Sequence, residues 1–181
     1  MNTYTLTITN QLPNYEALQE GFYLLLINYH KTPPHLAMVI NGSLYEYNVK
    51  STEYLVAYSK WSVLYAKLKT PVLAIKLNAL GYSVSELQTQ LITAFNFSTQ
   101  EPTSCLMPIN TAIQNTYNID TQACYVVFDL LAKLNFSDII THIILCNPSD
   151  KILITNNELC INSYTAAIVQ QHIANLKNRI K

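Results

Sequence analysis

A cysteine and a histidine in this 181-residue chain could act together on a carbonyl group. Ser104 has the features of a helix N-cap, which would place Cys105 in the first turn of a helix, with Pro108 shortly after it. A thiol at that position feels the positive end of the helix dipole, which favours the thiolate. Unpaired backbone N–H groups nearby could bind the oxyanion formed when the thiolate attacks a carbonyl. Cys105 is therefore the predicted nucleophile.

His35 is the predicted base, because a cysteine nucleophile needs a proton acceptor within hydrogen-bond reach. It begins an apolar segment directly after Pro33-Pro34, and Asn41-Gly42 follows in the same stretch. Asn-Gly between β-prone runs is the strongest short-range signal of a hairpin, since both residues of a type I′ turn need positive φ. Residues 35–49 are thus predicted to form a hairpin with the histidine at the start of its first strand.

The pairing register of this hairpin predicts the group that orients the histidine. A two-residue turn sets His35 opposite Asn48 and Ala37 opposite Glu46, and paired side chains share a face. Asn48 could then fix the imidazole tautomer in a Cys-His-Asn arrangement, with Glu46 as the second choice. A three-residue turn would shift the register and bring position 49 or 50 opposite the histidine instead.

Other segments show the periodicities of strands and helices around this hairpin. Strands are predicted at about 3–9, 22–27, 71–77, 141–146, 151–155 and 158–161. Helical segments are predicted at 15–20, from 51 or 52 to 68, at 83–95, 105–116, from 120 or 121 to 134, and from 163 to 180. Strands lead, helices cluster in the middle and strands return. This order predicts a single α+β domain over residues 1–181 with a mainly antiparallel sheet and a central group of helices.

The combination of a strand that begins with histidine, a Gly turn, a tyrosine-bearing strand and a much later cysteine that opens a helix resembles the circularly permuted papain-like hydrolases. That group includes the NlpC-type permuted peptidases, the PPPDE peptidases and the lecithin:retinol acyltransferase-like proteins. The matching segments are His35 to Tyr47 and Ser104 to Ile113. The resemblance implies a permuted papain-like fold and attack on an amide, ester or isopeptide carbonyl. Ser104 replaces the usual Asn before the cysteine, and Pro108 is atypical of that helix.

The remaining cysteines and histidines have more ordinary interpretations. Cys124, near a predicted helix start, is a rival nucleophile, although its neighbours favour packing. Cys146 and Cys160 alternate within predicted strands and are expected in the core. His30 lies in a loop and could contact a substrate. The other two, His142 and His172, lie on apolar-periodic segments, where a histidine with satisfied hydrogen bonds is the common outcome.

Composition excludes several classes of function. Eleven basic residues balance eleven acidic ones, which argues against nucleic-acid binding. The N-terminal segment lacks the pattern of a signal peptide, and no apolar run is long enough to span a membrane, so a cytoplasmic location and reduced thiols are expected. The cysteines form no C-x-x-C pair and glycine occurs only three times, so neither a metal nor another cofactor is expected.

Two functions remain open at this point. The first is a cytoplasmic cysteine hydrolase or acyl/peptidyl transferase that uses Cys105 and His35 on a peptide, amide or ester substrate. The second is a non-catalytic binding or structural protein on the same scaffold, which contacts a protein partner through some of its thirteen tyrosines. The sequence does not specify the substrate, the partner or the oligomeric state.

Overall fold

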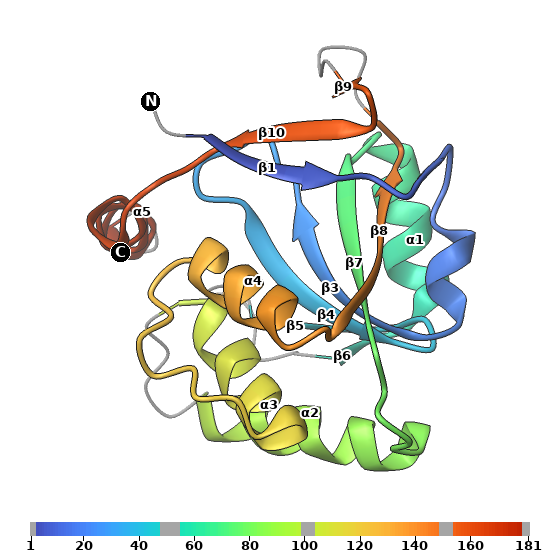
Figure 1. The fold of residues 1–181 in the computed structure, drawn as a ribbon, viewed down its shortest axis with the longest axis vertical. Helices are drawn as coiled ribbons and strands as arrows, with labels where there is room; N and C mark the ends of the chain where they lie inside the picture. Colours follow the sequence, from blue (N-terminus) through green and yellow to red (C-terminus); the bar gives the residue numbers. More distant parts are fainter. Residues whose placement is uncertain (1–2, 48–54, 99–103, 149–153, 179–181) are drawn as a thin grey trace.

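A mixed seven-stranded sheet runs through the molecule (Figure 1). The computed structural model describes residues 3–47, 55–98, 104–148 and 154–178. In spatial order the strands are β2 (Asn10–Leu12), β8 (Ile140–Cys146), β7 (Val72–Leu77), β3 (Phe22–Ile27), β4 (His35–Ile40), β5 (Ser43–Glu46) and β6 (Leu55–Val56). The pairing of β2 with β8 is parallel, and the other pairs are antiparallel. The predicted α+β class with a mainly antiparallel sheet is confirmed.

A second, antiparallel sheet and a set of helices complete the described part of the fold. The small sheet has the order β1 (Thr3–Thr7), β10 (Glu158–Asn162) and β9 (Ile154–Thr155). The helices are the 3₁₀ turn η1 (Glu16–Gln19), α1 (Tyr58–Lys67), α2 (Val84–Ser98), α3 (Leu106–Tyr117), α4 (Val127–Phe136) and α5 (Ala166–Asn178).

The two faces of the large sheet are covered differently (Figure 1). On one face, Trp61 of α1 and Leu18 of η1 pack with alternate residues of the central strands, such as Leu25 and Val39. On the other face, the residues in between pack with α2, α3, α4 and the small sheet in the larger of the two cores. Because β3 is covered on both faces, its six residues are all buried, as its continuous apolar sequence predicts.

The β4–β5 hairpin follows the predicted register. Asn41 and Gly42 have φ angles of 43° and 79°, the positive values that a type I′ turn requires. Ile40 pairs with Ser43, and Ala37 pairs with Glu46. The turn is also held from outside, since the Gly42 carbonyl accepts a 2.8 Å hydrogen bond from the Trp61 indole. The described part of β5 ends at Glu46, so the predicted pairing of His35 with Asn48 lies outside the described residues.

Two predicted helix starts are wrong. Helix α1 begins at Tyr58 rather than near residue 51 or 52, because Leu55 and Val56 pair with β5 as the edge strand β6. Helix α4 begins at Val127 rather than near residue 120, because the Asp120 carboxylate accepts the Gln122 N–H at 2.9 Å and stabilises a local turn. The residues predicted to cap α1, Ser51 and Thr52, are outside the described part of the chain.

Helix α3 begins one residue later than predicted. Its N-cap position is held by Cys105 rather than Ser104, and the Met107 N–H bonds to the Ser104 carbonyl at 3.3 Å. Helix α3 packs against strand β4. This packing brings the start of α3 to the start of the histidine-bearing strand.

Candidate active site

His35 and Glu46 form an ion pair across the hairpin. The His35 Nε2 and Glu46 Oε2 atoms are 2.9 Å apart. The two residues are diagonal neighbours on the same face, since Glu46 pairs with Ala37, two positions after His35. The side chains are 36% and 20% exposed, so solvent reaches the imidazole while the carboxylate is largely enclosed.

Cys105 completes a row of three polar side chains. Its thiol lies near the His35 ring, where it raises the pKa of the imidazole. Since Nε2 faces Glu46, Nδ1 is the ring nitrogen left for the sulfur. Cys105 is half-buried at the edge of the larger core, next to the N-terminus of α3. The structure thus brings together Cys105, His35 and Glu46, which the chain supplies from three separate elements.

The charge state of His35 is set by these two neighbours. Burial of the imidazole favours the neutral ring, but hydrogen bonds with Cys105 and Glu46, and the negative charges of both groups, outweigh it and raise the pKa of His35 from 6.5 to about 10. At neutral pH the ring is therefore an imidazolium. In that form both ring nitrogens carry a proton, so His35 can donate to the carboxylate on one side and to the sulfur on the other.

Tyr164, which the sequence analysis did not select, also belongs to the surroundings of the thiol. It is 7% exposed and packs on the Phe128 ring at a centroid distance of 5.1 Å. Burial and the negative charge of Cys105 raise the pKa of Tyr164, so the phenol keeps its proton. No local sequence signal indicated this, because Tyr164 is nearly sixty residues from Cys105 along the chain.

Cys124 has a different environment. It lies in the segment before α4 and is 4% exposed, and burial raises the pKa of its thiol. The charged groups acting on it are Lys133, Asp129 and Asp120. Burial disfavours the thiolate that a nucleophile needs, so the structure favours packing for Cys124.

All four thiols are free. Cys146 is fully buried, as predicted, and burial raises the pKa of its thiol to about 12. Cys160 was expected in the core but is exposed, because alternate residues of β10 face solvent. The histidines His30, His142 and His172 are exposed as well.

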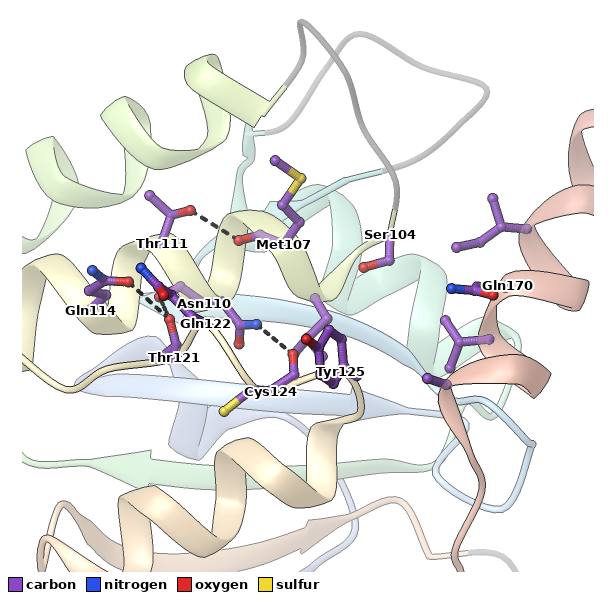
Figure 2. A pocket seen from close by; sticks show the side chains of 14 residues that line it. Ser104, Met107, Asn110, Thr111, Gln114, Thr121, Gln122, Cys124, Tyr125 and Gln170 are labelled. Atoms are coloured by element: carbon purple, nitrogen blue, oxygen red, sulfur yellow. Dashed lines mark hydrogen bonds between the residues drawn. The ribbon is translucent and has the colours of Figure 1, made fainter.

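A groove lies beside the start of α3, next to the residues that flank Cys105 (Figure 2). Its volume is about 390 Å³, and its walls come from α3, the segment 121–125 and α5. Ser104 and Leu106 line it, whereas the thiol between them lies near the His35 ring. The groove was not predicted, since α5 is distant in sequence from α3.

The expected tyrosine-rich surface is limited. Within the described part of the chain, most tyrosine side chains are buried or half-buried, and the exposed ones are Tyr82 and Tyr125. Most tyrosine rings here therefore serve packing, as in the cluster of Tyr15 and Tyr65 around Trp61.

Among the described residues, no group of three His, Cys, Asp or Glu side chains is arranged to hold a metal ion. No helix in the described segments is long and apolar enough to cross a membrane. Comparison of the chain with protein-family models, curated proteins and solved structures found no match.

Proposed function

We propose that this protein is a cysteine hydrolase or acyl/peptidyl transferase that acts in the cytoplasm on an amide, ester or isopeptide carbonyl. One observation carries the proposal: His35 is hydrogen-bonded to Glu46 and lies beside the Cys105 thiol, which raises the pKa of the imidazole. A nucleophile, a base and a group that orients the base are the parts that covalent catalysis by a thiol requires. The thiol also lies at a helix N-terminus, where the dipole favours its anion.

The first half of the reaction forms an acyl-enzyme. The Cys105 thiolate attacks the carbonyl carbon, a carbon–sulfur bond forms, and the carbonyl electron pair moves to oxygen. When the tetrahedral intermediate collapses, the bond to the leaving nitrogen or oxygen breaks. The His35 imidazolium gives its Nδ1 proton to that leaving group, and a thioester remains on Cys105.

The second half regenerates the site. Neutral His35 takes a proton from water, or from an amine or alcohol acceptor, as that group attacks the thioester carbon. The carbon–sulfur bond breaks and the thiolate leaves, so the imidazolium–thiolate pair forms again. Glu46 keeps the ring in place and stabilises its positive charge throughout both halves, as the orienting acid does in related triads.

Backbone amides near the nucleophile are the candidate oxyanion donors. Leu106, at the first helical position, has no acceptor within its own helix. Pro108 has no N–H, and the Met107 N–H already bonds to the Ser104 carbonyl. We therefore assign the oxyanion contact to the Leu106 N–H.

The order of the parts along the chain supports a permuted papain-like assignment within this proposal. The histidine hairpin precedes the cysteine helix, and the helix packs against the strand that carries the histidine. This is the arrangement that the sequence resemblance to the circularly permuted hydrolases implies.

Site-resolved alkylation tests the proposal without knowledge of the substrate. Native protein is treated with iodoacetamide at pH 6, and the modified cysteines are identified by peptide mass spectrometry. Cys160 is the internal control, because it is more exposed than Cys105 and its sulfur lies near a threonine hydroxyl rather than a histidine. We expect Cys105 to react first. Slow labelling of Cys105, at or below the rate of Cys160, would contradict the proposal and favour a non-catalytic binding protein.

A further inference from the structure

The groove beside Cys105 has an uncharged lining. Fourteen described residues line it, and none of them is charged at neutral pH. The charged pair of the proposed active site, His35 and Glu46, is not part of this lining. A ligand with formal charge would lose hydration in the groove without gaining an opposite charge, so the lining favours a neutral ligand.

The groove combines amide groups with apolar side chains. Figure 2 shows Gln170 of α5 facing Ser104 across the groove, with Tyr125 below Ser104 and beside Cys124. Asn110, Gln114 and Gln122 add further amide groups, each of which can donate and accept. Apolar lining residues such as Val169 and Ile173 provide contacts for a hydrocarbon portion.

One acceptor in the lining has no donor. The Asn110 side-chain nitrogen donates to the Cys124 carbonyl at 2.9 Å. Its oxygen, Oδ1, is buried and has no hydrogen-bond partner among the described residues. A buried acceptor without a donor costs free energy. Because this oxygen has almost no exposed surface, a molecule in the groove contacts it only after the Asn110 side chain moves.

We propose that this groove binds an uncharged peptide segment of the substrate, next to the carbonyl that Cys105 attacks. The inference rests on the proposed function and names the substrate class for it. A peptide offers N–H and C=O groups to the lining amides as well as side chains for the apolar residues. A hydrocarbon chain would bury those amides without partners, which disfavours a lipid acyl group. The volume is within the range of small-ligand sites.

The test uses three probes that alkylate cysteine: chloroacetamide, chloroacetyl-Gln-Leu-Gln-amide and chloroacetyl-Glu-Leu-Glu-amide. The labelling rate of Cys105 is measured by peptide mass spectrometry. For each protein, the rate with a peptide probe is divided by the rate with chloroacetamide. In the unmodified protein the neutral peptide should label Cys105 at least several-fold faster than chloroacetamide, and the acidic peptide should show no such gain.

A matched pair of variants locates the peptide. Gln170 and its neighbour Gln171 are both exposed, but only Gln170 lines the groove. Gln170→Lys should raise the rate of the acidic peptide relative to the neutral one by about twofold to fivefold, the range of an exposed ion pair. Gln171→Lys should leave that ratio unchanged at 0.15 M salt.

Three results would overturn the inference. The groove is rejected as the peptide site if Gln170→Lys and Gln171→Lys change the ratio of acidic to neutral peptide rates equally. It is also rejected if the neutral peptide labels Cys105 no faster than chloroacetamide. Neither result argues against a reactive Cys105. Failure of chloroacetamide itself to label Cys105 ahead of Cys160 would reject the proposed function, and the substrate assignment with it.

Discussion

Cys105 and Cys124 both precede a helix of the same layer, yet their surroundings differ. Cys105 is half-buried and lies beside His35, whose pKa it raises, whereas Cys124 is 4% exposed and burial raises the pKa of its thiol. The contrast shows that proximity to a helix start does not by itself place a thiol beside a charged partner. The residue that distinguishes the two cysteines is His35, which comes from a strand seventy positions before Cys105.

Removal of each sulfur gives the largest expected difference between the two cysteines. Cys105→Ala should abolish rapid iodoacetamide incorporation at pH 6 and any acyl transfer, because it removes the nucleophile. Cys124→Ala should retain both and lower the free energy of unfolding by about 1 kcal/mol, because it removes a buried sulfur. Mass spectrometry and urea unfolding measure the two effects. Loss of rapid iodoacetamide incorporation in Cys124→Ala instead would show that Cys124, and not Cys105, is the reactive cysteine.

Removal of the histidine should make Cys105 behave more like an isolated thiol. In His35→Ala the imidazolium that stabilises the thiolate is gone, so alkylation of Cys105 at pH 6 should slow by about tenfold or more. The control is His142→Ala, which removes an exposed histidine of β8. An unchanged rate in His35→Ala would show that the histidine does not activate the thiol.

A smaller effect is expected in the pH dependence of stability. The pKa of His35 is higher in the folded state, about 10, than the unperturbed value of 6.5. Its contribution to stability is therefore fully present below about pH 6.5 and is lost as pH rises through about 10. His35→Gln cannot titrate, so the stability advantage of the unmodified protein over this variant should shrink between these pH values. Urea unfolding at both ends of the range measures it, and a constant or growing advantage would contradict the assigned charge state.

Much of the site was predictable because it depends on local signals. The Asn41-Gly42 turn specified the register of the hairpin, and that register placed Glu46 on the same face as His35. Asn48 is predicted ahead of Glu46 because directly opposed side chains in a hairpin are closer than diagonal ones. In the structure the Glu46 carboxylate nevertheless reaches the His35 ring diagonally. The first choice, Asn48, lies outside the described residues.

The features that were not predictable depend on distant segments. The start of α4 is stabilised by the Asp129 carboxylate, which accepts the Tyr125 and Val126 N–H groups at 3.0 and 3.1 Å and competes with the cap signal at Asp120. Tyr164 reaches the surroundings of Cys105 from beyond β10. The groove needs α5, which lines it opposite the start of α3 although the two helices are distant in sequence.

Electrostatic coupling of Cys105, His35 and Glu46 can be measured by an NMR titration of the His35 ring. In the unmodified protein the ring should titrate near pH 10. Glu46→Gln and Cys105→Ala should each lower this midpoint toward 6.5, because each removes a negative charge that stabilises the imidazolium, while the midpoint of exposed His142 stays unchanged. A His35 midpoint near 6.5 in the unmodified protein, unaffected by either substitution, would contradict the account.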